Sequence, residues 1–311
     1  MTNLPEVVAE RNEHVARFHG TWYRGENTNF IPSKAELREP DAVERFLLHG
    51  WLPISPFITK ASRITSFGSC FALYLTEHLH AAGYNVLGKH LDLHSHIIRF
   101  GEGIVNTFAI RQQLEWALDG KEMPDNLWYG PNKEVALVDP AIRAETKQII
   151  ESTDVFVFTL GLSEIWYDKV SGEAFWRAIP KDMFDETRHG FRVSSCEENF
   201  DNLARIRALI RARRPAAKIV FTLSPMPLMA TFRPVSCLTA SSVSKAILRV
   251  AIDQLMRDHS GDTDLFYFPS YEIVRDFFTD PFEDDNRHPK PETIRFVMNT
   301  FERHYCVADP A

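Results

Sequence analysis

The sequence predicts an α/β fold of the doubly wound kind, with a five-stranded parallel sheet between two layers of helices. From residue 61 onward, short apolar segments alternate with helical segments, which is typical of a parallel sheet. The segments at 154–161 and 218–225 are almost continuously apolar, as expected of strands buried on both faces. In such a sheet, functional sites gather at the carboxyl ends of the strands. The five expected strands are 63–67, 84–88, 154–161, 218–225 and 264–270.

The region before the first strand is expected to be an extension of the core domain. Residues 1–60 lack an alternating strand pattern and predict a polar helix, a loop and a second helix over 39–50. We therefore expect an N-terminal extension, 1–60, that packs on an α/β domain formed by 61–311.

Helix start and stop signals place helices between the strands. Asn106 or Thr107 is expected to begin a helix that Gly120 ends. Ser195 and Glu198 predict a capping box at the start of another helix. The other expected elements are a hairpin inserted at 164–180 and helices over 70–83, 139–152, 241–259, 271–278 and 292–305.

Composition and charge exclude several classes of function. The chain has 311 residues, 35 of them basic and 42 acidic, a net charge of −7 and no long basic run, so nucleic-acid binding is not expected. The N-terminal residues lack the apolar core of a signal peptide, and the apolar runs are too short to span a membrane. Four scattered cysteines without a CxxC pair fit neither a zinc site nor a disulfide scaffold. We therefore expect a cytoplasmic protein that needs no metal or cofactor.

The first expected strand ends in Gly68-Ser69-Cys70, directly before a helix. At a helix N-terminus, the unpaired amides and the helix dipole favour a thiolate or an oxyanion. The alternative is that Cys70 is a small buried filler, because free cysteine is among the most buried residue types.

Two further strand ends carry polar residues. Gly161, Ser163 and Glu164 follow a buried strand, and Asp285 lies three residues before His288 beyond the last strand. Within one turn, an aspartate can accept a hydrogen bond from an imidazole and leave the other ring nitrogen as a base for a nucleophile. The alternative for this pair is a capped helix start with an exposed histidine. Glu164 either acts as an acid or holds the hairpin by a salt bridge.

Four blocks of the sequence resemble the GSCFA family. "FGSCFA" at 67–72 is the signature after which that family is named, and "TLGLSEIW", "TLSPMPLMATF" and "FYFPSYEI…DNRHP" follow in the family's order. The resemblance covers nearly the whole chain. The family is similar in turn to the SGNH (GDSL-type) hydrolases, so the resemblance implies a three-layer α/β/α sandwich with a flavodoxin-like sheet.

The resemblance also implies a catalytic triad. Cys70 falls on the nucleophile position of the SGNH hydrolases, and Asp285 and His288 match their Asp-x-x-His pair. In this register Ser69 supports the turn, whereas a slip of one residue would make Ser69 the nucleophile.

The oxyanion hole departs from the SGNH pattern. Ser163 stands where those hydrolases carry an asparagine, and a hydroxyl reaches less far than an amide. The glycine of the second block is either Gly101 or Gly103, with Asn106 as an alternative donor. Gly161 marks the same block as Ser163.

Acyl-ester chemistry is the function that the resemblance implies. We expect an esterase or O-acyltransferase that takes a small-molecule acyl donor and acts on a carbohydrate or polysaccharide. A glycan-binding module that has lost catalysis and a redox-sensing thiol protein are the alternatives.

Two further groups of residues have a structural and a functional interpretation. His90, His94 and His96 could hold a metal, but leucines and an isoleucine alternate with them as in a half-exposed extended segment. Several aromatic residues near the expected strand ends either stack on sugars or bury apolar area. These aromatic residues are Trp128, Tyr129, Trp166, Tyr167, Phe175 and Trp176.

Overall fold

The computed structural model of this chain forms two compact units, Met1–Pro40 and Asp41–Ala311. In the smaller unit, β1 (Val7–Arg11) and β2 (His14–Phe18) pair antiparallel, and η1 is a 3-10 turn over Glu36–Arg38. The polar helix expected near the N-terminus is therefore wrong. Only two residues separate β1 from β2, which suits a hairpin, and the valines in both strands favour extended backbone. The structure describes residues 7–11, 14–18, 26–68, 70–89, 95, 105–124, 127 and 140–308.

The larger unit begins before the expected boundary at residue 60, because residues 41–60 belong to it. Phe57 and Ile58 both donate their backbone N–H to the carbonyl of Tyr305 at 2.9 Å, and Ile58 forms a parallel bridge with Cys306. These bonds join the start of the unit to its end. The packing of an N-terminal extension on the core stays a prediction.

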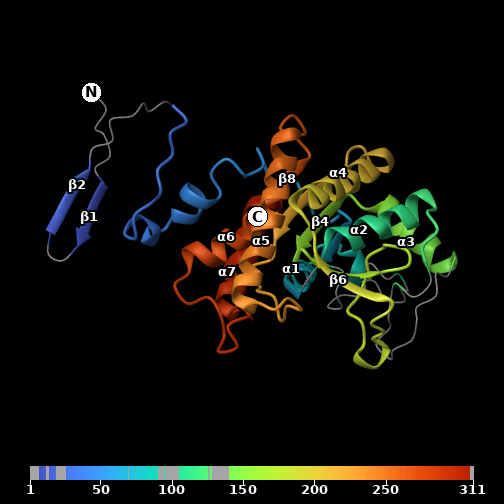
Figure 1. The fold of residues 1–311 in the computed structure, drawn as a ribbon. Coiled ribbons are helices and arrows are strands. Elements are labelled where there is room, and N and C mark those ends of the chain that lie inside the picture. The colour runs from blue at the N-terminus through green and yellow to red at the C-terminus, as the bar shows by residue number, and fades with distance from the viewer. Residues whose placement is uncertain are drawn as a thin grey trace. The chain divides into compact units, whose positions relative to one another are not determined.

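A four-stranded parallel sheet in the order β3-β4-β7-β8 lies at the centre of the larger unit (Figure 1). The prediction of five strands is wrong by one. The expected strand at 84–88 contributes only a single parallel bridge, between Val86 and Ile64, because the chain turns directly into the 3-10 helix η3, Leu87–Lys89. The strands cover Ile64–Gly68, Val155–Leu160, Lys218–Leu223 and Leu265–Phe268.

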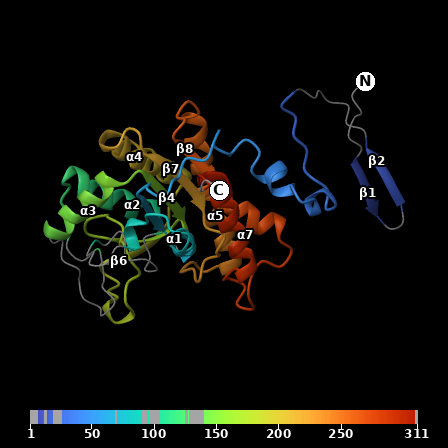
Figure 2. The ribbon, with the colours of Figure 1, turned by 180° about the vertical axis from the view of Figure 1, so that it is seen from behind.

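Helices cover both faces of this sheet (Figure 2), which confirms the predicted α/β class. On one face Phe67, Phe158 and Phe221 stack across three neighbouring strands, with ring centroids 4.7 and 5.2 Å apart. On the other face, smaller apolar side chains of the strands pack against α1 and α7. The aromatic face is covered by α2 (Thr107–Leu114), α3 (Pro140–Ser152), α4 (Cys196–Arg213) and α5 (Cys237–Asp258), and the opposite face by α1 (Cys70–Ala81) and α7 (Pro291–Tyr305).

The predicted helix ends are confirmed where they rest on specific caps. Asn106 caps α2, because its Oδ1 accepts the backbone N–H three residues on at 2.8 Å. Gly120, with a φ of 75°, ends the π-helical turn η5, Glu115–Asp119, that continues α2. Ser195 and Glu198 form the expected capping box at the start of α4.

The inserted hairpin is wider than expected. β5 (Glu164–Asp168) pairs antiparallel with β6 (His189–Val193), whereas only a single bridge, between Tyr167 and Ala174, forms within the span 164–180. The remaining short elements of the described chain are η2 (Val43–Leu47), η6 (Lys181–Met183), α6 (Ser270–Glu272) and η7 (Ile273–Phe277).

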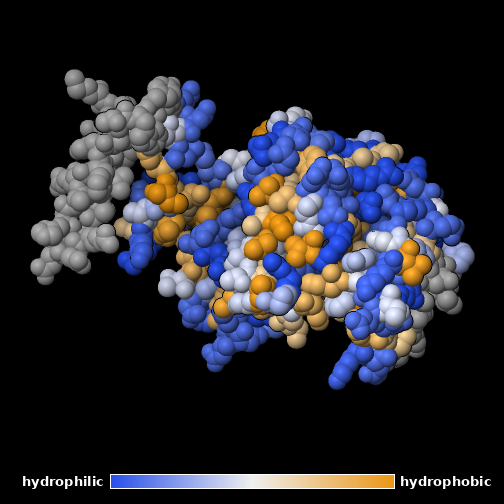
Figure 3. All heavy atoms as spheres, in the orientation of Figure 1, coloured by the Kyte–Doolittle hydropathy of each residue, from blue (hydrophilic) through white to orange (hydrophobic). Residues whose placement is uncertain are grey.

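Helix α5 has two different faces. Its outer face exposes Leu238, Val243 and Val250, and Figure 3 shows apolar surface over this helix among hydrophilic surroundings. Its inner face carries a buried stripe that includes Ser244 and Lys245. A buried lysine needs polar partners, and the partner of Lys245 belongs to the candidate site described below.

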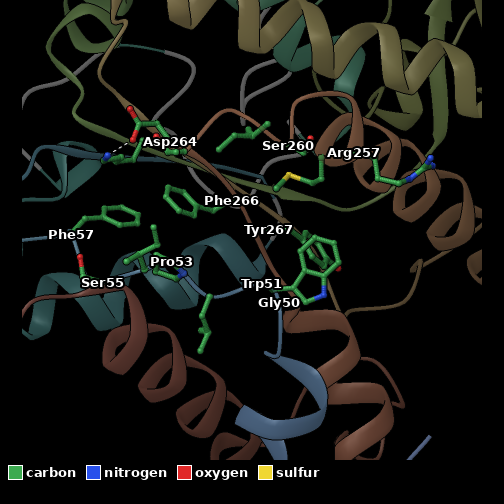
Figure 4. Close-up of a pocket in the computed structure, with 16 residues that line it drawn as sticks. Gly50, Trp51, Pro53, Ser55, Phe57, Arg257, Ser260, Asp264, Phe266 and Tyr267 are labelled. Carbon is green, nitrogen blue, oxygen red and sulfur yellow. Dashed lines mark hydrogen bonds and ion pairs between the residues drawn. The ribbon is translucent and has the colours of Figure 1, made fainter. Parts of the chain in front are cut away.

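A cavity of about 540 Å³ lies at the amino ends of the sheet strands, where β7 and β8 begin (Figure 4). Trp51, Phe57 and Phe266 line it, together with Lys218 and Asp264 at the starts of β7 and β8. The polar motifs singled out in the sequence lie at the carboxyl edge instead, so this cavity is not the candidate active site.

We expect Gly68→Ala to destabilise the fold strongly. Gly68 has a φ of 131°, and an added Cβ would lie 2.1 Å from the carbonyl oxygen of Thr159. The free energy of unfolding should fall by about 3 kcal/mol or more, because backbone strain adds to a clash with a neighbouring strand. Gly172→Ala is the control, since Gly172 has a φ of 77° and no atom within 4 Å of its added Cβ. Its loss in urea unfolding should be about 1 kcal/mol; equal losses would contradict the prediction.

Candidate active site

The Asp285–His288 pair lies in the turn that precedes α7. Oδ2 of Asp285 is hydrogen-bonded to Nδ1 of His288, and Oδ1 accepts the backbone N–H groups of Arg287 at 3.0 Å and His288 at 2.9 Å. Asn286 has a φ of 54°, which folds the turn tightly. The hydrogen bonds from the backbone and side chain of His288 lower the pKa of Asp285 to about 2. Asp285 is therefore ionised at neutral pH and holds the imidazole with its proton on Nδ1.

The other ring nitrogen of His288 contacts Arg287. Nη1 of Arg287 lies 2.9 Å from Nε2 of His288. A guanidinium has no acceptor, so it donates this hydrogen bond and Nε2 accepts it. Nε2 therefore presents the lone pair that a general base needs, and Arg287 covers that lone pair.

Cys70 is the first residue of α1, at the carboxyl end of the sheet. Gly68 pairs with Thr159 in the parallel register of β3 and β4, so Cys70 and Gly161 each lie two residues beyond a paired position. The Cys70 side chain is half-buried, and the first turn of α1 contains no acidic residue. Cys70 thus begins a helix whose unpaired amides face the edge where Gly161 lies.

Tyr74 shows that the first turns of α1 and the Asp285–His288 turn share their surroundings. The pKa of Tyr74 is raised, first by burial and then by the negative charges of Cys70 and Asp285, while Arg287 acts in the opposite direction. In the described part of the chain, no hydrogen bond joins Cys70 to His288. The structure therefore pairs Asp285 with His288 and brings their turn near α1, and a bond from Cys70 to His288 stays a prediction.

Ser163, the candidate oxyanion donor, is fully buried and already bonded. Its backbone N–H and its hydroxyl donate to Oγ of Ser244 at 2.8 and 3.3 Å. Its carbonyl accepts the N–H and the hydroxyl of Ser194 at 2.9 and 2.7 Å. The polar groups of Ser163 therefore brace the loop that follows β4.

Lys245, which is not among the residues singled out in the sequence, lies beneath the same loop. Nζ of Lys245 donates to the carbonyl of Gly161 at 2.7 Å, and the side chain is only 3% exposed. Burial, reinforced by the positive charge of Arg287, lowers the pKa of Lys245 to about 7. The spacing of Ser241, Ser244, Lys245 and Leu248 is that of a buried helix face, and this was the signal that could have revealed it.

Asn106 and Glu164 both have structural bonds. The cap of α2 uses Oδ1 of Asn106, so the amide group that could donate to an oxyanion takes no part in the cap. Both oxygens of Glu164 accept the hydroxyl of Thr231 at 2.9 Å, and Arg233 lies 4.0 Å away. Glu164 thereby joins the hairpin to the loop after β7, which is the salt-bridge interpretation of this residue.

Some residues singled out in the sequence lie outside the described part of the chain. They are Ser69, His90, His94, His96, Gly101, Gly103, Trp128 and Tyr129. Among the described residues, no group of three or more histidine, cysteine, aspartate or glutamate side chains could hold a metal. Within the same residues, no helix has the length and apolar character needed to cross a membrane.

The described aromatic residues divide into a buried and a partly exposed set. Trp176 and Phe175 are buried in the core. Trp166 instead packs edge-on against Phe232, with ring centroids 4.8 Å apart, and Phe191 lies 5.2 Å from Trp166. Because Phe232 is 63% exposed, this cluster presents an aromatic surface beside the loop that Glu164 holds.

The protein is of the α/β class. It carries a histidine–aspartate pair near a helix that begins with a cysteine at the carboxyl edge of its parallel sheet. Residues 63–301 match the GSCFA family. The match spans most of the chain, and the chain belongs to the GSCFA family. No curated protein matches the chain at a significant level.

Several solved structures of carbohydrate esterases are distantly similar to this chain. A family 3 carbohydrate esterase from Talaromyces cellulolyticus is 11% identical, with a TM-score of 0.40 over 78% of this chain and 95% of that one. A family 3 carbohydrate esterase from Clostridium thermocellum is 10% identical, with a TM-score of 0.34 over 79% and 94%. A family 2 carbohydrate esterase with a carbohydrate-binding domain from Corynascus thermopiles (Myceliophthora fergusii) is 14% identical, with a TM-score of 0.37 over 81% and 67%. Likenesses of this size define neither a substrate nor a mechanism.

We expect the buried Lys245 to give the protein an unusual pH dependence of stability. An unfolded lysine titrates near pH 10.4, so between about pH 7 and 10 the unfolded state binds more protons than the folded state. The free energy of unfolding of the wild type should therefore rise with pH relative to that of Lys245→Met, by up to about 1.4 kcal/mol per pH unit.

Urea unfolding at pH 7.5, 8.5 and 9.5 measures this difference. Lys147→Met is the control, because Lys147 is half-exposed on α3 and only 3.8 Å from Glu151. Its difference from the wild type should not change with pH. A Lys245→Met difference that is flat or falls with pH would show that folding does not lower the pKa of Lys245.

Proposed function

We propose that this protein is an acyl-ester enzyme, an esterase or O-acyltransferase, with Cys70 as nucleophile, His288 as base and Asp285 as the residue that orients His288. The observation that carries the proposal is the Asp285–His288 pair, in which Nδ1 is held by an ionised carboxylate and Nε2 is an acceptor. Its turn shares electrostatic surroundings with the helix that Cys70 begins. Membership of the GSCFA family supports the same assignment.

The proposed reaction proceeds through a thioester. The Cys70 thiol gives its proton to Nε2 of His288 and its sulfur attacks the acyl carbonyl, so a sulfur–carbon bond forms. The tetrahedral oxyanion collapses, the carbon–oxygen bond to the alcohol breaks, and His288 returns the proton to the leaving alcohol. Water or a sugar hydroxyl then attacks the thioester, again with His288 as base, and Cys70 is released as the thiol.

The oxyanion needs donors at the carboxyl edge of the sheet. We propose the backbone N–H of Cys70, which at the first position of α1 has no partner within the helix. Asn106, or a glycine at 101 or 103, would supply the second donor. Ser163 is a weaker candidate, because its hydroxyl already donates to Ser244.

A carbohydrate substrate is the finer part of the proposal. The partly exposed cluster of Trp166, Phe191 and Phe232 is the kind of aromatic surface that stacks on sugar rings. The same cluster would suit a glycan-binding module without catalysis, so turnover is the decisive measurement. Transfer to a sugar hydroxyl is favoured over hydrolysis wherever such rings exclude water from the thioester.

We expect Cys70→Ala to lose about 1,000-fold or more of the kcat for 4-nitrophenyl acetate, because no nucleophile remains. Ser69→Ala should retain most activity. Cys196→Ala is the matched control, since Cys196 is also half-buried and begins a helix, α4, which packs on the opposite face of the sheet. The reverse ranking of Ser69→Ala and Cys70→Ala would place the nucleophile at Ser69. Saturable glycan binding without turnover by the wild type would support the binding-module alternative.

The thioester itself should be trapped when the acceptor is withheld. Acid quenching after mixing with 4-nitrophenyl acetate, followed by peptide mass mapping, should find an acetyl group on the peptide that contains Cys70. Asp285→Asn should reduce the rate of this acylation by about 100-fold or more, because the carboxylate no longer fixes the Nδ1 proton of His288. An undiminished rate in Asp285→Asn, or acylation equal at Cys70 and Cys196, would contradict the scheme.

A further inference from the structure

Lys245 and Arg287, two basic residues near the candidate active site, have no carboxylate partner among the described residues. Several arginines elsewhere in the larger unit do have one: Arg192, Arg207 and Arg214 each contact a carboxylate at 2.6–2.7 Å. Among the ion pairs of the described residues, none involves Lys245 or Arg287. Neither group is therefore neutralised by direct contact with a described carboxylate, although Glu283, Asp284 and Asp285 belong to the same turn as Arg287.

Arg287 has only one side-chain hydrogen bond to a described residue, and its acceptor is uncharged. Its Nη1 donates to Nε2 of His288, and its Nε is buried without a hydrogen-bond partner among the described residues. The nearest carboxylate in sequence, Asp285, already accepts from two backbone N–H groups and from Nδ1 of His288. A guanidinium binds best to the two oxygens of a carboxylate or phosphate, and Arg287 has neither.

Lys245 also has hydrogen-bond donors to spare, and it is more deeply buried than Arg287. Its ammonium group has three N–H donors, and the one bond it makes to a described residue is that to the carbonyl of Gly161. A buried ammonium without an anion is costly, because its desolvation is not offset by an opposite charge. Gly161 and Cys70 each lie two residues beyond the Gly68–Thr159 pair, so Lys245 contacts the loop at the carboxyl edge of the sheet.

The two cations also act on each other. The positive charge of Arg287 contributes to the lowered pKa of Lys245, so the two side chains lie within electrostatic reach of each other. An anion that contacts both groups would favour the protonated form of Lys245 and offset the repulsion between the two charges.

We propose that Lys245 and Arg287 form a subsite that binds an anionic oxygen group of the substrate, a carboxylate or a phosphate, and that Arg287 leaves Nε2 of His288 when this subsite is filled. Binding of the anion would uncover the lone pair of Nε2 at the moment when the acyl group reaches Cys70. The free enzyme would then hold its base covered, and an anionic ester would be preferred to a neutral one. The anion site follows from these contacts alone, whereas its part in selecting a substrate rests on the proposed function.

Alkylation of Cys70 tests the anion site without requiring any enzymatic activity. Iodoacetate and iodoacetamide react with a thiolate in the same way: a sulfur–carbon bond forms and iodide leaves. The two reagents differ in charge, so the ratio of their rates reports the local potential. We expect the iodoacetate to iodoacetamide ratio at Cys70 to fall about fivefold or more in Arg287→Gln, and by less in Lys245→Met, because Arg287 is always charged whereas Lys245, with a pKa of about 7, is only partly protonated near neutral pH.

Peptide mapping supplies the controls in the same samples. Cys196 also begins a helix, and its ratio should be the same in wild type and variants, although Glu197 and Glu198 in its first turn lower its absolute value. Arg257→Gln is the control variant, since Arg257 is 62% exposed and pairs with Asp253. Arg287 is itself only partly buried, so Arg287→Gln tests the subsite even if Lys245→Met does not fold. A ratio at Cys70 that does not respond to Arg287→Gln would overturn the proposal.

Matched esters test whether the subsite selects the substrate. We expect the wild type to prefer 4-nitrophenyl hemisuccinate to 4-nitrophenyl butyrate in kcat/KM, and Arg287→Gln to lose about tenfold of this preference. A second comparison, of an acetylated uronic acid with the corresponding acetylated neutral sugar, makes the same test with the anion on the alcohol part of the ester. If no ester is turned over but the alkylation ratio responds to Arg287→Gln, the anion site stands and the proposed function fails. If esters are turned over with equal preference in all arms and the ratio does not respond, the subsite fails and the proposed function stands.

Discussion

The parallel pairing of β3 with β4 is the constraint on which the rest of the site depends. Gly68 can lie opposite Thr159 only because it has no Cβ, since any side chain would collide with the carbonyl of Thr159. β3 ends at this pair, and β4 continues for one more residue, to Leu160. Cys70 and Gly161 then follow at equivalent positions, so the loop above β4 and the helix after β3 meet at one edge. Lys245 can reach that edge because the loop carbonyl of Gly161 is held there.

Much of this fold could be predicted because local signals and burial agree. Three of the four strands of the sheet, β4, β7 and β8, are nearly continuous apolar runs. Asn106, Gly120 and Ser195 cap helices in the ways that their side chains or backbone favour. The strand at 84–88 failed because pairing is a tertiary property: Val86 finds one partner, and the chain then turns away. The hairpin expected over 164–180 failed for the same reason: Tyr167 forms only one bridge within that span, with Ala174, and the partner strand of β5 lies further on, at His189–Val193.

Only those parts of the candidate site that are formed by residues close in sequence could be predicted. Asp285 and His288 are three residues apart, and a spacing of this kind can be recognised in a sequence. Lys245 and Arg287 could not be recognised in this way, because their significance lies in what surrounds them. A lysine on a helix and an arginine in a turn look like ordinary surface residues until burial and the missing carboxylates are known. The hydrogen bonds that make Ser163 a weaker oxyanion donor could not be predicted for the same reason, since they come from residues far away in sequence.

The bridge between Ile58 and Cys306 has a consequence for how this unit can be combined with other domains. The N–H of Val307 also donates to the carbonyl of Ile58 at 2.8 Å, so the segment that leads into β3 lies beside the segment that follows α7. A domain with adjacent entry and exit can be inserted into a surface loop of another protein while its host remains continuous. Its own ends could equally be joined and the chain reopened elsewhere, because the order of the strands in space does not require a break at this point.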